Sequence, residues 1–195
     1  MIIVITPEQP IRNETGIINE LFQAGLELLH VRKPVMDAAA IRNYIKNIDS
    51  GYHEQLVLHS HYILAEEFGT SRLHFKESER PNIPDHFFDE YIVSTSVHCI
   101  DDFNRLDPRW EYALISPVFP SISKKGYGTD TKVLESIRQR ENDDSGLIAL
   151  GGINQHNIDA VFSEDVDGAA LLGAVWESKE PLKTYTQCMQ NALLL

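Results

Sequence analysis

The stretch ISPVFPSISKKGYG, residues 115–128, places hydroxyl groups and positive charge directly after an apolar run. Ser121 and Ser123 supply short hydroxyl donors, and Lys124 and Lys125 supply two ammonium groups. Both kinds of group are hydrogen-bond donors that suit the oxygens of a phosphate. We interpret the stretch as a flap over an anionic ligand; the alternative is a loop that only faces solvent.

Glycines mark two further positions where a phosphate can bind. In ALGGINQHNI, Gly151 and Gly152 fall between an apolar run and a helical pattern, and Gly173 follows the last apolar run. Glycine lets the backbone approach a ligand closely, and free N–H groups at the start of a helix bind anions. The pattern predicts that these three residues hold a phosphate through backbone N–H groups. A plain tight turn is the alternative for Gly151 and Gly152.

Polar residues also lie at the ends of the second to fifth apolar runs or directly after them. These are His30, Arg32 and Lys33, then His59, Ser60 and His61, then His74, Lys76, Glu77 and Glu79, and finally Thr95, Ser96 and His98. A single histidine at such a position is more often a surface or core group than a catalyst. In a barrel of parallel strands, however, all strands point their carboxyl ends at one mouth, where the ligand site lies. We therefore expect these residues to share one site.

The elements that would position these residues are eight short apolar runs. The runs are 2–5, 28–32, 56–59, 72–75, 91–96, 112–115, 147–150 and 167–172. Helical spacing follows most of them, for example in 154–162, whereas the proline-broken segment 81–84 has none. This alternation predicts an α/β fold, a compact (β/α)₈ TIM barrel that forms one domain over residues 1–195. A doubly wound open sheet is the alternative, and it would require that 56–59 and 72–75 are not strands.

The charge of the chain limits its partners. The formal net charge is −12 at pH 7. Nucleic acid and anionic membranes attract basic surfaces, so we expect neither as a partner. An anionic small molecule would need a local positive pocket, for which Arg32, Lys33, Lys124 and Lys125 are the candidates. The first six residues have no basic flank and precede Pro7, so they predict neither a secretion signal nor a membrane span, and we expect a cytoplasmic protein.

The motifs at the strand ends resemble those of the thiamin phosphate synthase and TenI-type thiazole tautomerase superfamily of (β/α)₈ barrels. LLHVRK is similar to the family's Leu-Gln-Leu-Arg-Glu-Lys strand, and VSTSVH to its Ser-x-His strand end. ISPVFPSISKKG is similar to its Gly-Pro-Val-Phe-x-Thr-x-Thr-Lys loop, and ALGGINQHNI with DGAALLGAV to its phosphate-binding end. The resemblance covers nearly the whole chain in order.

The resemblance implies a synthase that joins hydroxymethylpyrimidine diphosphate to thiazole phosphate and releases diphosphate. It implies catalytic roles for Arg32 at the diphosphate, Ser96 on the pyrimidine side and Lys124 over the diphosphate. The implied substrate-binding residues are His30, Lys33, His59, His98, Ser121, Ser123, Gly151, Gly152 and Gly173. The partners would then be small phosphorylated pyrimidine and thiazole substrates. The sequence leaves the oligomeric state open, a homo-oligomer included.

The positions of the family's magnesium ligands are altered in this chain. The family's Asn-Asp pair after the third strand is here His59 and Ser60, and only Glu79 or Glu77 stands in for the second acidic ligand. The resemblance implies Mg²⁺ as a cofactor, but a hydroxyl in place of a carboxylate binds this hard cation poorly. Glu79 is therefore the candidate metal ligand of an incomplete site.

Two alternatives to a synthase remain. A thiazole tautomerase of this superfamily typically has a histidine acid or base after the sixth strand, where this chain has Pro117. Proton transfer would then fall to His59, His61, His74 or His98, which we expect to titrate near neutral pH. The other alternative is a non-catalytic protein that binds phosphorylated thiamin precursors.

Overall fold

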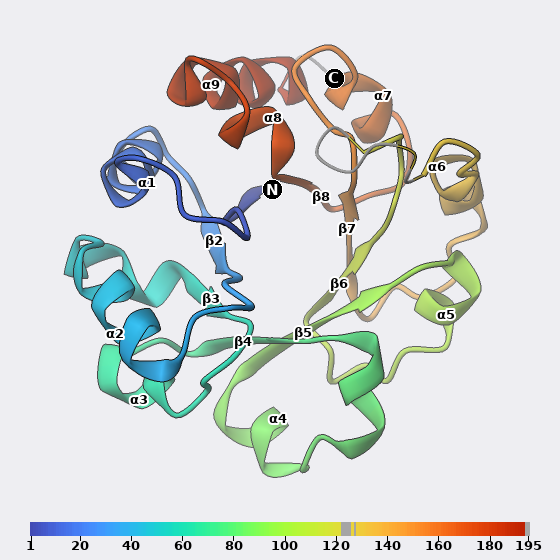
Figure 1. The fold of residues 1–195 in the computed structure, drawn as a ribbon. Coiled ribbons are helices and arrows are strands. Elements are labelled where there is room, and N and C mark those ends of the chain that lie inside the picture. Colours follow the sequence, from blue (N-terminus) through green and yellow to red (C-terminus); the bar gives the residue numbers. More distant parts are fainter. Residues whose placement is uncertain (122–125, 127, 194–195) are drawn as a thin grey trace.

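Eight parallel strands close into a barrel in sequence order (Figure 1). The computed structural model describes residues 1–121, 126 and 128–193. The strands are β1 (Ile2–Ile5), β2 (Leu28–Val31), β3 (Leu56–Leu58), β4 (Arg72–Phe75), β5 (Ile92–Val97), β6 (Tyr112–Ile115), β7 (Gly146–Leu150) and β8 (Gly168–Leu171). Strand β1 pairs with both β2 and β8, so that Ile3 lies opposite Leu28 on one side and Ala170 on the other. This closure confirms the predicted barrel and excludes the open sheet.

Mostly short helices surround the strands. They are α1 (Glu14–Gln23), α2 (Ala38–Lys46), α3 (Leu64–Phe68), α4 (His86–Glu90), α5 (Ile100–Asn104), α6 (Val133–Ser136), α7 (Ile158–Phe162), α8 (Gly173–Trp176) and α9 (Pro181–Ala192). The connections also contain the 3₁₀ helices η1 (Ser50–Gln55), η2 (Glu77–Asn82) and η3 (Ile137–Gln139). Among the described residues, no helix has both the length and the apolar character needed to cross a membrane.

Alternation along each strand divides the apolar side chains between two cores. The core inside the barrel consists of Ile3, Ile5, Leu28, Val57, Tyr112, Leu114, Ile148 and Ala170. The intervening residues, such as Val4, Leu29 and Leu147, join the larger core beneath the helices. Because the strands are buried on both faces, they appear in the sequence as continuous apolar runs.

One side of the barrel interior is polar. His30 of β2, His74 of β4, and Ser94 and Ser96 of β5 face inward, and His59 joins them directly after β3. Apolar side chains of β1, β6, β7 and β8 fill much of the other side. A buried polar group costs free energy unless it has a hydrogen-bond partner. The polar half of the interior is therefore stable only as a connected network.

Two local predictions differ from the structure. The helix expected over 154–162 begins only at Ile158, because Asn154 forms a turn in which its side chain accepts the N–H of His156. The region around 81–84, where no helix is expected, contains the end of η2, and α4 begins just beyond it. Pro84 precedes α4 and so does not interrupt it.

Candidate active site at the barrel mouth

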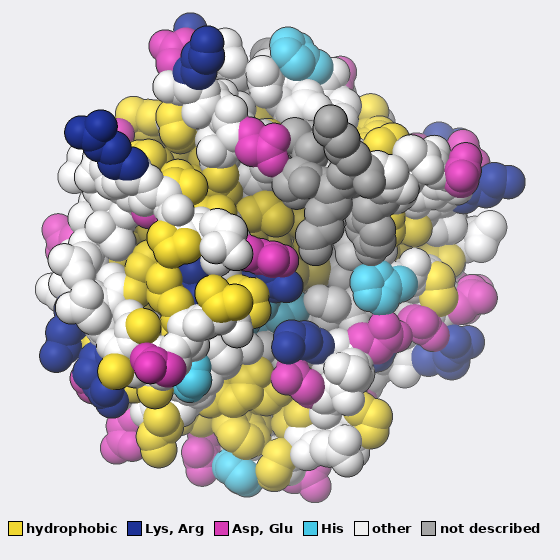
Figure 2. Space-filling view, viewed as in Figure 1, with side chains coloured by type: hydrophobic (Ala, Val, Ile, Leu, Met, Phe, Trp, Pro, Cys, Tyr) yellow, Lys and Arg dark blue, Asp and Glu magenta, His cyan; other side chains and the backbone are white. Residues whose placement is uncertain are grey.

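A cavity of about 600 Å³ opens where the strands end. Its walls include Glu8 after β1, Arg32 after β2, His98 after β5, Ser121 after β6 and Gly173 after β8. The space-filling view shows charged side chains of both signs around a central hollow on this face (Figure 2). Residues far apart in the sequence thus meet in one space, at the carboxyl ends of the strands, as expected for a barrel.

Arg32 enters this cavity from the end of β2. Its backbone is fixed by Thr6, whose hydroxyl accepts the N–H of Arg32 at 2.8 Å and donates to the Arg32 carbonyl at 3.1 Å. The guanidinium Nη1 lies 2.6 Å from Oε1 of Glu8, and both side chains are partly exposed. The same fork of N–H donors can pair with phosphate oxygens. The carboxylate of Glu8 therefore occupies a position beside Arg32 where a ligand anion can bind instead.

A smaller cavity adjoins the mouth and is lined by Gly151, Gly152 and Gly173 together with Ser121. We call these three glycines the glycine cradle. Gly151 and Gly152 have φ values of 110° and 66°, in the left-handed region that favours glycine. A Cβ atom on Gly152 would also lie 2.7 Å from Cβ of Phe119. Both the backbone conformation and the packing therefore require glycine at position 152.

The loop after β6 is hydrogen-bonded to the glycine cradle. The N–H of Val118 donates to the Leu150 carbonyl at 3.0 Å, and the N–H of Phe119 donates to the Gly151 carbonyl at 3.1 Å. The side-chain amide of Asn157 donates to the Gly152 carbonyl at 3.1 Å. The carbonyl oxygens of both glycines are thus engaged within the protein.

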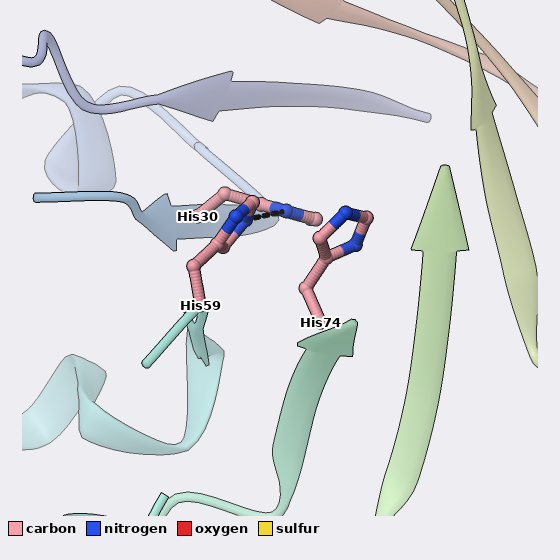
Figure 3. Close-up of side chains that lie close together, drawn as sticks. All are labelled: His30, His59 and His74. Atoms are coloured by element: carbon pink, nitrogen blue, oxygen red, sulfur yellow. Dashed lines mark hydrogen bonds between the residues drawn. The ribbon is translucent and has the colours of Figure 1, made fainter. Parts of the chain in front are cut away.

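Three histidines from neighbouring strands meet inside the barrel, and we call them the histidine cluster (Figure 3). Nδ1 of His30 lies 2.8 Å from Nε2 of His59, and Nε2 of His30 lies 2.7 Å from the hydroxyl of Tyr112. The ring of His74 stacks on that of His59, with centroids 4.2 Å apart. His30 is 0% exposed, His74 2% and His59 9%. His59 is therefore the member closest to solvent.

Two serines of β5 hold His74. Its Nδ1 lies 2.9 Å from Oγ of Ser94, and its Nε2 lies 2.9 Å from Oγ of Ser96. Ser96 is expected on the pyrimidine side of the site. Its hydroxyl faces the histidine cluster, and Ser96 is not among the described residues that line the mouth cavity.

Burial lowers the pKa of each histidine in the cluster. The pKa of His74 falls to about 3, first because of burial and then because of the positive charge of Arg32. Burial, followed by the influence of His74, places the pKa values of His30 and His59 well below the usual range. All three imidazoles are neutral at pH 7 as a result. This corrects the expectation that His59 and His74 titrate near neutral pH.

Lys33 points away from the mouth although it follows Arg32 directly. Its Nζ lies 2.6 Å from Oε1 of Glu14 and donates to the Pro7 carbonyl at 2.6 Å, and its side chain is fully buried. Side chains of successive residues in an extended chain point to opposite sides. Lys33 therefore lies outside the barrel wall, beside α1. This corrects the prediction that Lys33 binds substrate and adds to a positive pocket.

The other predicted residues are either at the mouth or outside the described residues. His98 lines the mouth cavity, and its Nε2 lies 3.7 Å from Oε2 of Glu77. Ser123, Lys124 and Lys125 lie outside the described residues. Arg32 is thus the one predicted cation that the described part of the chain places at the mouth.

Sequence reasoning missed Thr6, Glu8 and Tyr112. Thr6 and Glu8 directly follow β1. A search of the residues after the first strand, like the search made after the second to fifth, would have found both. Tyr112 resembles any apolar strand residue in the sequence. Its role in the site is its hydrogen bond with His30, which is 82 residues away in the sequence. No local sequence pattern indicates that contact.

The predicted magnesium ligands do not fit Mg²⁺. Oε2 of Glu79 accepts the N–H of Lys76 at 2.7 Å and so caps η2. Within the described part of the chain, the one set of three acidic, histidine or cysteine groups close enough to share a metal ion is the histidine cluster. Position 60 offers only a neutral hydroxyl. Mg²⁺ prefers charged oxygen ligands, so the predicted ligands do not form a suitable site for this ion.

The chain matches known proteins over most of its length. Residues 2–175 match the family model described as thiamine monophosphate synthase. The thiamine-phosphate synthase of Staphylococcus carnosus is 22% identical over 184 residues, which cover 89% of this chain and 86% of that protein. The thiamine-phosphate synthase of Leptospira biflexa is 27% identical over 159 residues, which cover 76% of this chain and 73% of that protein.

Solved structures share the fold. The thiamine phosphate pyrophosphorylase from Bacteroides thetaiotaomicron superimposes with a TM-score of 0.81 at 27% identity, covering 99% of this chain and 98% of that chain. The thiamine phosphate pyrophosphorylase from Pyrococcus furiosus superimposes with a TM-score of 0.79 at 18% identity, covering 99% of this chain and 95% of that chain. The second comparison supports the barrel fold alone.

Proposed function

Because this chain belongs to the thiamine monophosphate synthase family, we propose that it joins hydroxymethylpyrimidine diphosphate to thiazole phosphate and releases diphosphate. One observation carries the proposal: Ser121, Leu150, Leu172 and Gly173 line both the mouth cavity and the smaller cavity at the glycine cradle. One anionic group beside Arg32 and another at the glycine cradle can thus occupy adjacent space. A reaction between two phosphorylated substrates requires this arrangement.

We assign the thiazole phosphate to the glycine cradle. Gly151, Gly152 and Gly173 would bind its oxygens through backbone N–H groups, with the Ser121 hydroxyl beside them. The small volume of this cavity, about 40 Å³, suits a compact anionic group rather than a ring. The thiazole ring would then lie in the mouth cavity.

We assign the diphosphate to Arg32. In the proposed reaction the thiazole nitrogen bonds to the methylene carbon of the pyrimidine, and the carbon–oxygen bond to the diphosphate breaks. The diphosphate leaves with the electron pair, so positive charge aimed at its oxygens stabilises the transition state. Arg32 would exchange its pairing with Glu8 for the diphosphate, and Ser123 and Lys124 are candidates for further hydrogen-bond donors to it.

We place the pyrimidine over the polar half of the barrel interior. His59 offers an imidazole there that matches the ring nitrogens and amino group of the pyrimidine. Ser96 would act on the pyrimidine side through its hydrogen bond to His74. His98 would contact the substrates from the rim of the mouth. His30 is fully buried, and both of its ring nitrogens are hydrogen-bonded. We therefore propose that His30 positions His59 and does not contact the substrate.

A non-catalytic binder of the same phosphorylated precursors is the second candidate. Ser60 favours it, because this position carries no charged oxygen that would help to neutralise a leaving diphosphate. The tautomerase alternative is less well supported. His59 and His74 are buried and neutral, which leaves them poor proton carriers at pH 7.

Incubation of the purified protein with both precursors tests the proposal. We expect stoichiometric release of diphosphate together with thiamin phosphate. Tight binding of thiazole phosphate by calorimetry without diphosphate release would support the binder. Neither binding nor turnover would refute both. Cell fractionation and light scattering would test the cytoplasmic location and the homo-oligomer, which remain predictions.

A further inference from the structure

We propose that His30, His59 and His74 form a binding site for a divalent transition-metal ion of the zinc type. Each side chain offers one ring nitrogen, and these three nitrogens lie within 4.8 Å of one another (Figure 3). Neutral imidazole nitrogen is a preferred ligand of Zn²⁺, Co²⁺ and Ni²⁺, whereas Mg²⁺ prefers oxygen. The nitrogen donors of this site therefore favour Zn²⁺, Co²⁺ or Ni²⁺ over Mg²⁺.

The hydrogen bonds around the cluster indicate which ring nitrogens of His74 and His30 carry the lone pairs. Oγ of Ser94 donates its proton to the Leu73 carbonyl at 3.2 Å, so it must accept from Nδ1–H of His74. The lone pair of His74 is then on Nε2, where it accepts the proton of Ser96 Oγ at 2.9 Å, so a bound metal ion would have to displace this hydrogen bond. In the same way, a proton on Nε2 of His30 can be donated to the Tyr112 hydroxyl, which leaves the lone pair on Nδ1. A second hydrogen bond of this kind orients most histidine ligands of metals.

His59 would supply the third metal ligand through Nε2, the ring nitrogen that faces His30. One proton lies between Nδ1 of His30 and Nε2 of His59, which are 2.8 Å apart. When the metal ion binds, this proton would shift from Nε2 to Nδ1 of His59, and the ion would take its place between the two rings. The three imidazoles therefore remain neutral. Zinc–nitrogen bonds of about 2.0–2.1 Å require the two nitrogens to separate to roughly 3.3 Å. Because the rings of His59 and His74 are stacked, one of them must also rotate about its side-chain torsions.

The charges around the cluster indicate what else the ion binds. Positive charge from Arg32 and Lys76 acts on His59, and that of Arg72 acts on His30. Arg32 is paired with Glu8, and the remaining positive charge favours an anionic fourth ligand, such as hydroxide or a phosphate oxygen. Access from the mouth would be past His59, which follows β3 and at 9% is the most exposed of the three histidines.

The alternative is a polar network that is complete without an ion. Each cluster histidine already has a hydrogen-bond partner, so burial by itself does not demand a metal. The two interpretations differ in stoichiometry, metal preference and dependence on these three side chains. None of these quantities depends on synthase activity.

Metal titration of the chelator-treated, dialysed full chain tests the site. We expect one equivalent of Co²⁺ to produce the visible absorption of a low-symmetry cobalt–imidazole site. One equivalent of Zn²⁺ should abolish this absorption, and excess Mg²⁺ should not. His59→Gln and His74→Gln should each weaken Co²⁺ affinity by about tenfold or more. The matched control is His86→Gln, which replaces an exposed histidine outside the cluster and should leave the titration unchanged.

Wild-type protein provides a measurement that does not depend on the folding of variants. Addition of Zn²⁺ should shift the imidazole NMR signals of three of the eight histidines, with saturation at one equivalent. Absence of stoichiometric binding would overturn the proposal, as would unchanged Co²⁺ affinity in both folded cluster variants. If metal binds as expected but no diphosphate is released from the thiamin precursors, the proposed function fails while this site stands.

Discussion

Nζ of Lys33 lies 2.6 Å from Oε1 of Glu14 in an ion pair in which neither side chain is more than 5% exposed. The adjacent residue, Arg32, reaches the mouth cavity on the other side of the barrel wall. Two consecutive cations thus serve different purposes, one in the packing of the barrel against its helices and one in the site. The hydroxyl of Tyr44 also donates to Oε1 of Glu14, so removal of Lys33 would leave a buried carboxylate with reduced compensation.

Replacement of Lys33 by methionine should therefore destabilise the protein. We expect Lys33→Met to lower the free energy of unfolding by about 3–5 kcal/mol, because it leaves Glu14 charged and buried. Urea denaturation measures the change. The double variant Lys33→Met with Glu14→Gln should recover a substantial part of the loss. Equal stability of Lys33→Met and the wild type would contradict the structural role.

Glycine at position 152 should matter for packing as well as for backbone conformation. Gly152 and Gly69 both have φ of 66°, but a Cβ atom on Gly69 would meet nothing within 4 Å. Gly69→Ala should cost about 1–2 kcal/mol from backbone strain alone. We expect Gly152→Ala to cost more, because its Cβ would collide with Phe119 and Pro120.

The two glycine variants also separate stability from binding. Calorimetry should find weaker binding of thiazole phosphate to Gly152→Ala and unchanged binding to Gly69→Ala. Equal losses of unfolding free energy and of affinity in the two variants would show that the contact with the β6 loop has no role.

Removal of the Arg32 charge should impair the diphosphate substrate selectively. Charge-assisted hydrogen bonds contribute about 1.5–3 kcal/mol, so Arg32→Gln should lower kcat/KM by about 10- to 100-fold. Steady-state kinetics with each substrate varied in turn measures this. Arg105→Gln is the matched control, because Arg105 is a surface residue paired with Asp102. A comparable loss in the control would argue against a specific role for Arg32.

Acid should destabilise the metal-free protein through the histidine cluster. His74 has a pKa of about 3 in the folded state and 6.5 as its reference value, so below pH 6.5 the unfolded chain binds more protons. The stabilisation is present above pH 6.5 and is lost as the pH falls toward 3. Between pH 7 and pH 5, His74 alone should account for about 2 kcal/mol of lost unfolding free energy.

Urea denaturation of chelator-treated protein at the two pH values measures that loss. His74→Gln should reduce it by about the amount assigned to His74, and His86→Gln should leave it unchanged. An identical pH dependence in the wild type and His74→Gln would mean that His74 does not remain neutral in the folded state.

Local patterns predicted the strands more reliably than the helices. The apolar run 72–75 coincides with β4, and 112–115 coincides with β6, because alternation and apolar content are properties of a few neighbouring residues. The start of α7 was predicted four residues too early. There the side chain of Asn154 accepts the N–H of His156 and stabilises a turn in place of the first helical residues. The spacing of the apolar residues does not indicate this turn.

The repeated strands and the glycine turn at 151 and 152 could be predicted from residues close together in the chain, and the family from the order of such motifs along it. The ion pair of Lys33 with Glu14 and the meeting of three histidines, in contrast, result from the folding of the strands into a barrel. Barrel closure and strand register bring those histidines together: His30 lies opposite Val57, and β4 follows β3 around the barrel. The contact between His30 and His59, which are 29 positions apart, arises from that register, which no single stretch of the chain encodes.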